Sequence, residues 1–355
     1  MKRVDERDIM FSRMERKKGT PEYEDYYKRR KDLKDIDDEL RAMPEMDSED
    51  TAMFNKLNTP LVSATFNFLS DIKELVEGPE KNPDKIEASP EIFTKKVKGI
   101  ASYYGSVLEG ITKCDESYYY SHRGRDDSSY GKKVNPKHEN TIVFAVEMDK
   151  NNIYAAPQLI ESIEVTKAYL DAAVIGMMLT YYIKKLGYSA RNHMDGNYEM
   201  MLPLAAKKAG LGDIGRHGML ITEKYGSRVR LGAVTTDMPL VIDKESDFNV
   251  NDFCEICKKC ISTCPAKAIH EEKELDINGI KRWQINREEC YKKWRILGTD
   301  CGICIATCPF SSDIREELIE EYKKDSQIAE KIIQEHEKKY KIRPFSKEKP
   351  EWMND

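Results

Sequence analysis

Eight of the nine cysteines in this chain lie between residues 254 and 308, and their spacing suits metal chemistry. The first four follow the pattern C-x2-C-x2-C-x3-C-P, at Cys254, Cys257, Cys260 and Cys264, with Pro265 behind the last. This spacing lets a tight loop aim three thiolates at one iron–sulfur cluster while the fourth points elsewhere. In two-cluster ferredoxins the fourth cysteine ligates the other cluster. The pattern therefore predicts a second cysteine set further along the chain.

That second set is present in the sequence, as Cys290 followed by the cysteines of CGICIATCP, which are Cys301, Cys304 and Cys308. The crossed assignment predicts one 4Fe–4S cluster on Cys254, Cys257, Cys260 and Cys308 and another on Cys264, Cys290, Cys301 and Cys304. Ten residues separate Cys290 from Cys301, where two are usual, so a longer loop must deliver this ligand. Two structural zinc sites are the competing interpretation, because paired C-x2-C also suits tetrahedral zinc.

Composition and charge narrow the class of protein. The chain has 355 residues, with 58 basic and 63 acidic side chains, so its net charge of -5 gives no general electrostatic reason to expect a nucleic-acid partner. No stretch approaches the ~18 apolar residues of a membrane span. The charged start lacks the apolar core of a signal peptide, so we expect a cytoplasmic protein. In that compartment, metal or redox use of the cysteines is favoured over disulfides.

The texture of the sequence divides the chain into four parts. Residues 1–50 carry 13 basic and 16 acidic side chains and are expected to form a charged extension, either a solvated arm or short helices lying over another surface. Residues 51–245 are expected to form the main domain and residues 246–312 the cluster domain. Residues 313–355 read as a tail containing one charged amphipathic helix that covers another surface.

Within the main domain the apolar pattern predicts alternating helices and strands. Apolar residues recur at helical intervals over 53–75, and a second helix is expected to begin at Ser89 as its N-cap. The segment 140–149 reads as a buried strand, 160–186 as a long helix, and 227–240 as a further strand. This alternation predicts an α/β (α+β) layer architecture.

Longer stretches resemble a known family. LGYSARNHM, AAKKAGLGDIGRHGMLITEKYGSRVRLGAVTTDMPL and the two cysteine sets, in that order, resemble the corrinoid-dependent reductive dehalogenases, and so does the opening VDERDIMFSRMERKKGTPEYEDYYKRRKDLKDIDDELR. Epoxyqueuosine reductase, a related family, shares the AGLG-x-IG-(K/R)-H element and the two clusters but not the N-terminal stretch. The resemblance implies a nitroreductase-like domain that holds base-off cobalamin, followed by a ferredoxin-like domain with two 4Fe–4S clusters.

The resemblance also suggests residues that contact the corrinoid. Gly210, Gly212 and Gly215 suit a backbone that approaches a large planar ligand closely. Arg216 is a candidate partner for a propionamide or the nucleotide phosphate, and the TTDMPL stretch with Thr235 and Thr236 is expected to line the same pocket. The alternative is a glycine-rich turn with no ligand.

For catalysis, the family uses a tyrosine as proton donor beside a lysine or arginine. Tyr169 is the candidate here by its place in the long helix, with Arg228 or Arg230, at alternate strand positions, as its cationic partner. Asn197 or Asn192 is a candidate for holding the substrate or halide. The remaining rivals for the acid are Asp195, by analogy with the epoxyqueuosine family, and the tyrosines Tyr118, Tyr119, Tyr120, Tyr181 and Tyr182.

The function implied is reductive dehalogenation of an organohalide. Electrons from a ferredoxin, flavodoxin or flavoprotein would pass through both clusters to cobalt, with Trp283 and Trp294 shielding the clusters and Cys114 an inert thiol. One alternative is an epoxyqueuosine (tRNA) reductase or another corrinoid reductase. A second alternative, from another class, is a two-cluster electron carrier without a corrinoid.

Overall fold

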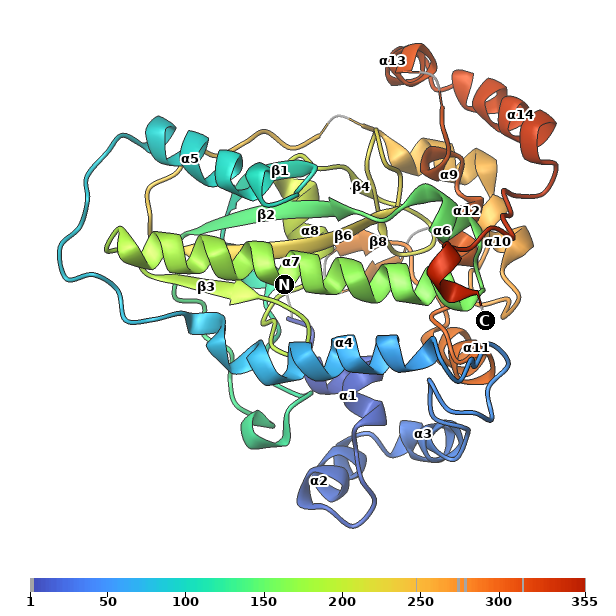
Figure 1. Ribbon diagram of the computed structural model, residues 1–355, viewed down its shortest axis with the longest axis horizontal. Helices are drawn as coiled ribbons and strands as arrows, with labels where there is room; N and C mark the ends of the chain where they lie inside the picture. Colours follow the sequence, from blue (N-terminus) through green and yellow to red (C-terminus); the bar gives the residue numbers. More distant parts are fainter. Residues whose placement is uncertain (1–2, 247, 273–274, 278–279, 315, 355) are drawn as a thin grey trace.

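The computed structural model describes residues 3–246, 248–272, 275–277, 280–314 and 316–354. At its centre is a four-stranded sheet in the order β1-β2-β6-β3, with every neighbouring pair antiparallel (Figure 1). The strands of this sheet are β1 (Leu108–Lys113), β2 (Asn140–Glu147), β3 (Ala190–His193) and β6 (Val229–Thr236). Short two-stranded ribbons are formed by β4 (Asp213–Ile214) with β5 (Leu220–Ile221), and by β7 (Leu275–Ile277) with β8 (Ile280–Arg282).

Helices cover both faces of the sheet. Strand β2 is buried almost throughout because its side chains alternate between two layers, with Ile142 and Phe144 facing helix α7 and Val143 and Ala145 packing towards α8. The helices of this part of the chain are α4 (Thr59–Ile72), α5 (Pro90–Tyr103), α6 (Lys150–Tyr154), α7 (Leu159–Lys185) and α8 (Leu202–Lys208). The chain is therefore a mixed α/β protein.

The predicted elements of this part are found with small shifts. The long helix and both strands appear within a few residues of their expected ends, and the Ser89 side chain accepts a hydrogen bond from the Ile92 amide at the start of α5. The helix expected over 53–75 is shorter, because the Asn55 side chain accepts backbone bonds in a turn just ahead of α4. A 3-10 helix, Lys73–Glu77, ends this segment.

The charged N-terminal part is folded against the rest of the protein rather than forming a solvated arm. It contains α1 (Met10–Met14), α2 (Pro21–Arg29) and α3 (Lys34–Arg41). The rings of Tyr23, Tyr26 and Tyr27 pack against one another in its core. Arg13 is fully buried and pairs with Asp37 of α3 and with Glu288 of the cluster domain. Helices α1 and α3 therefore contact α11 (Arg287–Leu297) of the cysteine-rich part, which lies next to α3 in Figure 1.

The cysteine-rich part consists of short helices joined by tight loops. They are α9 (Val250–Cys257), α10 (Lys259–Thr263), α11 (Arg287–Leu297) and α12 (Ile303–Thr307). The tail forms two helices, α13 (Glu316–Lys324) and α14 (Ile328–Tyr340), so the expectation of a single helix is wrong. Asp325 interrupts it, because its side chain accepts a hydrogen bond from the Gln327 amide. The tail still covers a surface, since Leu318, Tyr322 and Ile332 are buried beside α9.

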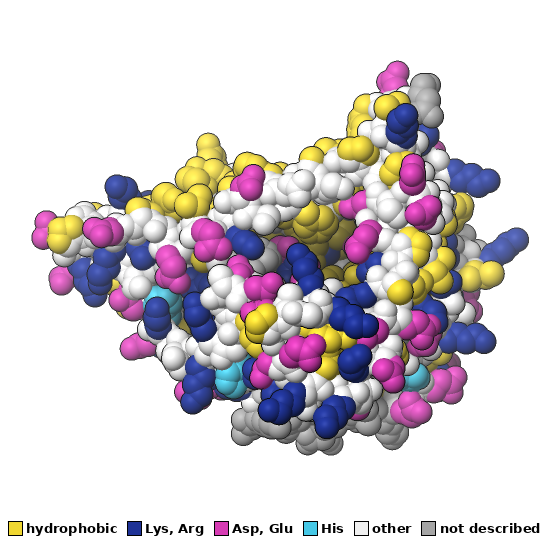
Figure 2. All heavy atoms as spheres, turned by 90° about the horizontal axis from the view of Figure 1, so that it is seen from below, with side chains coloured by type: hydrophobic (Ala, Val, Ile, Leu, Met, Phe, Trp, Pro, Cys, Tyr) yellow, Lys and Arg dark blue, Asp and Glu magenta, His cyan; other side chains and the backbone are white. Residues whose placement is uncertain are grey.

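The shape of the surface bears on ligand binding, and the length and apolar character of the helices bear on membrane insertion. On the face in Figure 2 a hollow has hydrophobic side chains at its floor, and basic and acidic side chains are interspersed around it. Among the described residues, none of the helices combines the length and the apolar character needed to cross a bilayer.

The buried ion pair in the N-terminal part generates a prediction about stability. Replacing Arg13 with alanine leaves the Asp37 carboxylate buried without its main partner, so we expect unfolding free energy to fall by about 3–5 kcal/mol. Thermal and denaturant melts would measure this loss. The matched control is Lys292→Ala, which removes an exposed pair with Glu39 between the same two parts and should cost at most about 1 kcal/mol. Equal losses in both variants would contradict the role given to Arg13.

Candidate active site

The structure brings the eight clustered cysteines together in two groups of four. Cys254, Cys257, Cys260 and Cys308 line one small cavity, whereas Cys264, Cys290, Cys301 and Cys304 line part of a larger one of about 430 Å³. These are the two sets that the crossed assignment predicts. Among the described residues, no three His, Cys, Asp or Glu side chains stand close enough together to hold a single metal ion.

Local backbone geometry places these thiols. Helix α9 ends at Cys257, and Lys258 adopts a left-handed conformation (φ 49°) that turns the chain directly into α10. Gly302, before α12, has a positive φ of 59°, and a Cβ there would lie 2.1 Å from the Glu161 carboxyl oxygen. Burial and the neighbouring thiols raise the pKa of Cys290 to about 12. A bound iron ion would displace that proton, so the all-sulfur donor sets fit iron–sulfur clusters.

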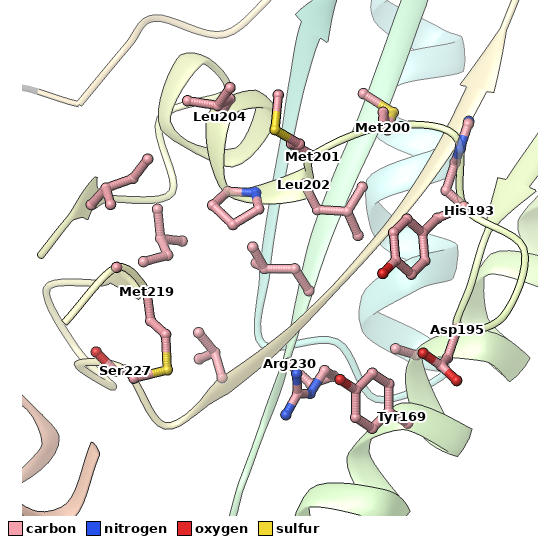
Figure 3. A pocket seen from close by; sticks show the side chains of 18 of the residues that line it. Tyr169, His193, Asp195, Met200, Met201, Leu202, Leu204, Met219, Ser227 and Arg230 are labelled. Carbon is pink, nitrogen blue, oxygen red and sulfur yellow. The ribbon is translucent and has the colours of Figure 1, made fainter. Parts of the chain in front are cut away.

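Three cavities meet at Tyr169. The first, of about 350 Å³, lies between α7, the sheet and α8, and Figure 3 shows side chains that line it. The second, of about 470 Å³, lies between the N-terminal part and α7. The third is the 430 Å³ cavity that reaches the second cysteine group. Tyr169 lines all three, so it stands where the space beside the cysteines joins the other two cavities.

Arg230 is the cation beside this tyrosine. Its guanidinium carbon lies 3.9 Å from the centre of the Tyr169 ring, and in Figure 3 the tyrosine hydroxyl points towards it. The Arg230 Nε atom is buried and has no hydrogen-bond partner within the described part of the chain. Burial raises the pKa of Tyr169, and Arg230 acts in the opposite direction by favouring the phenolate.

Arg228, the other predicted partner, lies elsewhere. It precedes β6, and its guanidinium donates to the Ser311 carbonyl (2.8 Å), to Glu147 (2.8 Å) and to the Met148 carbonyl (2.9 Å). These bonds tie the end of the cluster domain to the sheet. Only one of the two predicted arginines therefore contacts Tyr169.

Neither predicted asparagine lines one of the three cavities. The Asn197 amide donates to the Lys73 carbonyl (2.8 Å), and its side-chain oxygen accepts from Arg191 (2.9 Å). Asn192 is buried against α7, where a Cβ on Gly176 would lie 2.0 Å from its side-chain oxygen. Both residues are hydrogen-bonded to other segments of the protein.

The three predicted glycines serve contacts within the protein. A Cβ on Gly210 would lie 2.4 Å from the Lys244 carbonyl oxygen, and one on Gly212 would lie 2.2 Å from that of Ile221. On Gly215 it would meet the Ile221 side chain at 2.4 Å. None of the three lines a cavity that Tyr169 shares. The three glycines thus shape the turn itself, whereas Gly218 and Met219 of the same segment line the first and third cavities.

Arg216, the predicted partner of a propionamide or the nucleotide phosphate, is bonded to the cluster domain. It is 1% exposed, and its guanidinium lies 3.8 Å from the centre of the Trp283 ring. It donates to the carbonyl of Cys254 (3.2 Å) and to three carbonyls that follow α10, those of His270, Glu271 and Glu272. Its bonds are thus used to position the first cysteine group.

Thr235 and Thr236 are buried in β6 and do not line the cavities. The Thr235 hydroxyl bonds His138 (2.9 Å) and His193 (3.1 Å), and the Thr236 hydroxyl donates to the Ser189 carbonyl (2.6 Å). Sequence reasoning missed the side chains that do form the wall of the first cavity. They include five methionines, Met148, Met194, Met200, Met201 and Met219. The EMM run just before α8 is a sequence signal that could have indicated this methionine-rich wall.

The rival acids are distributed unevenly. Asp195 lines two cavities, and its carboxylate accepts from Arg125 (2.9 Å). Of the rival tyrosines, only Tyr120 lines a cavity that Tyr169 shares. Tyr198, which sequence reasoning missed, lines the first cavity, and burial raises its pKa to about 12.

The remaining predicted side chains lie as follows. The Tyr119 hydroxyl donates to Cys114 at 3.5 Å, and burial raises the pKa of the Cys114 thiol. Trp283 and Trp294 both line the cavity that holds the second cysteine group. Their position is compatible with the predicted shielding of the clusters.

The chain is similar in sequence to one family model and to several characterised proteins. Residues 253–312 match the family model of the 4Fe-4S dicluster domain. The chain is 35% identical over 186 residues to a tetrachloroethene reductive dehalogenase of Desulfitobacterium hafniense, in a match covering 49% of this chain and 33% of that protein. It is 30% identical over 270 residues to the tetrachloroethene reductive dehalogenase of Dehalobacter restrictus, covering 63% and 49%. Over these stretches the chain is homologous to reductive dehalogenases.

A solved structure extends this likeness to nearly all of the homologue. The catabolic reductive dehalogenase NpRdhA superposes with a TM-score of 0.79 at 23% identity, covering 96% of this chain and 46% of that one. The fold is therefore the reductive dehalogenase fold with a C-terminal dicluster domain. The homologue spans half or less of the length of these relatives. An epoxyqueuosine reductase of Lactococcus garvieae is more distant, at 27% identity over 146 residues.

The cysteine groups generate the prediction for this site. Protein reconstituted with iron and sulfide should hold about eight irons per chain, and Cys257→Ala should lose about four of them because it removes one ligand of the first group. Iron analysis and absorption spectra would measure the loss. The control is Cys114→Ala, which lies outside both groups and should keep all the iron. Full iron content in Cys257→Ala would contradict the assignment.

Proposed function

We propose that this homologue is a corrinoid and iron–sulfur reductase that removes halide from an organohalide. The observation that carries the proposal is the Tyr169–Arg230 pair at the junction of three cavities, one of which reaches the second cysteine group. The reaction consumes two electrons and one proton and releases halide and the hydrogenated product. The chain has a matching feature for each need: two cysteine groups for the electrons and a phenol for the proton.

The first and third cavities suit a large corrinoid. They adjoin, since both are lined by Tyr169, Met219 and Arg230. Two histidines also line them, but each has both ring nitrogens bonded within the protein: His193 to Thr235 and the Glu199 amide, and His217 to Ser227 and the Met219 amide. Neither has a nitrogen free for cobalt, which fits base-off cobalamin without a histidine ligand. When bound, cobalamin supplies the low-valent cobalt that reduces the carbon–halogen bond.

In this proposal the sheet and its helices are the nitroreductase-like corrinoid-binding domain, and the cysteine-rich part is a ferredoxin-like domain. The second cysteine group, which shares a cavity with Tyr169, is the inner cluster site. The first group is then the outer site, where electrons arrive from a ferredoxin, flavodoxin or flavoprotein. The domain boundaries and the cytoplasmic location stay predictions.

Tyr169 is the proposed proton donor. Its pKa is raised above the ordinary value of 10.0, so the phenol is protonated at neutral pH and can give its proton to the carbon that loses the halide. The phenolate left behind lies against the Arg230 guanidinium, which favours the charged form. Burial keeps Tyr169 protonated, and the Arg230 guanidinium stabilises the phenolate that forms when the proton is transferred.

One observation supports the epoxyqueuosine-reductase-like alternative. Asp195 lines two cavities beside Tyr169, as a catalytic aspartate would. Its carboxylate accepts a hydrogen bond from Arg125 (2.9 Å), however, so one of its oxygens is already engaged within the protein. For the electron carrier without a corrinoid, the three joined cavities would have no use.

A substitution of the proposed acid tests this function. Tyr169→Phe keeps the ring against Arg230 but removes the proton, so iron and cobalamin content should be unchanged while turnover of an organohalide falls about 10²–10⁴-fold. Halide release with a strong chemical reductant would be the assay. The matched control, Tyr182→Phe, changes a tyrosine of the same helix outside the three cavities and should leave turnover unchanged. If Tyr169→Phe is fully active and Asp195→Asn is not, the alternative acid is the right one.

A further inference from the structure

The second cavity has a wall of aromatic rings. It is hereafter the aromatic cavity, and Phe11, Phe66, Tyr169 and Trp294 are its rings. Phe11 and Trp294 lie with ring centres 6.1 Å apart, and Phe66 and Tyr169 with ring centres 5.8 Å apart. Val62 and Met46 add to this apolar surface. At about 470 Å³, the cavity is large enough for a small halogenated ring or alkene beside the proposed acid.

In the wall of the aromatic cavity, carboxyl groups outnumber basic side chains. Its cations are Lys73 and Arg125, and its carboxyl groups belong to Glu15, Asp47, Asp126, Asp195 and Asp300. Both cations are already paired: Lys73 lies 3.5 Å from Asp126, and Arg125 lies 2.9 Å from Asp195. Among the described residues that line this cavity, no cation is therefore left for the negative charge of a ligand.

Among these carboxyl groups, Asp47 has an oxygen that a ligand could contact. One of its carboxyl oxygens accepts from Ser63 (3.2 Å), and the other is buried with no partner among the described residues. Burial raises the pKa of Asp47, since water is largely removed from around the carboxyl. An uncharged N–H or O–H donor on a ligand could satisfy the unpaired oxygen. A ligand carboxylate would instead meet a second carboxyl group in a desolvated space, which is unfavourable without a cation.

We propose that the aromatic cavity is the substrate site and that it takes an uncharged organohalide while discriminating against organohalides that carry a carboxylate. This inference rests on the proposed function and adds the charge class of its substrate. The rings contact the apolar halogenated part of the ligand. The acidic wall rejects an anion, and the position of Tyr169 brings the proton donor to the bound molecule.

A matched pair of ligands tests the charge claim directly. 3-Bromobenzamide and 3-bromobenzoate share the ring and the halogen and differ mainly in charge. Equilibrium dialysis against protein reconstituted with iron, sulfide and cobalamin should show the amide bound at least about 10-fold more tightly than the carboxylate. Equal binding of both, tighter binding of the carboxylate, or no binding of the amide would each overturn the proposal.

Three variants locate the effect. Phe66→Ala should weaken amide binding several-fold, and unchanged binding would mean that the ligand sits outside the aromatic cavity. Asp47→Asn should strengthen carboxylate binding several-fold and leave the amide within about twofold, because a repulsive carboxyl is removed and a polar group is kept. The control is Asp50→Asn, an exposed aspartate outside the cavity, which should change neither affinity. If Asp47→Asn behaves like this control, the acidic wall does not set the preference.

The dialysis measures binding alone and separates this inference from the proposed function. A tenfold preference for the amide without halide release would leave the charge claim standing and remove the dehalogenase activity. Halide release from both ligands without any preference would do the reverse.

Discussion

The site depends on a cation and a phenol held together inside the protein. Burying the Arg230 guanidinium is costly unless negative groups compensate it. Two carboxyls lie close enough to act on it, the buried Glu161 and Asp300: burial raises the pKa of both, and Arg230 works against that rise by favouring their ionised forms. The arginine, the phenol and the two carboxyls thus form one electrostatic unit that no single element could hold.

The surrounding architecture supplies the members of this unit. Helix α7 carries Glu161 and Tyr169 about 12 Å apart along its axis, strand β6 carries Arg230, and the loop before α12 carries Asp300. Glycine at position 302 lets this loop pass the Glu161 carboxyl. The N-terminal helices close the aromatic cavity from the other side, anchored to the cluster domain by the buried Arg13. The cavity at the second cysteine group is therefore lined both by the α/β part of the chain and by the dicluster domain.

The parts that could be predicted from sequence are those whose signals are local. Cluster ligands obey short spacings, so both cysteine groups were predicted from their pattern, and α7 and β2 are largely apolar stretches of helix and strand length. Tyr169 was predicted as the proton donor from the family resemblance alone. Its position where three cavities meet could be seen only in the structure. What sequence alone does not show is each side chain's distant partners: the Arg216 guanidinium donates to carbonyls at 254 and 270–272. Thr235, Asn197 and Arg228 are committed in the same way to segments far away in the chain.

The central proposal is that two iron–sulfur clusters deliver electrons to a corrinoid beside Tyr169, through the second cysteine group whose cavity Tyr169 shares. Anaerobic reconstitution with iron, sulfide and cobalamin, followed by metal analysis and an absorption spectrum, tests it most directly. The account predicts about eight irons and one cobalt per chain, with the spectrum of base-off cobalamin. Eight irons with no cobalt would contradict it, and would leave a two-cluster electron carrier whose cavities serve some other ligand.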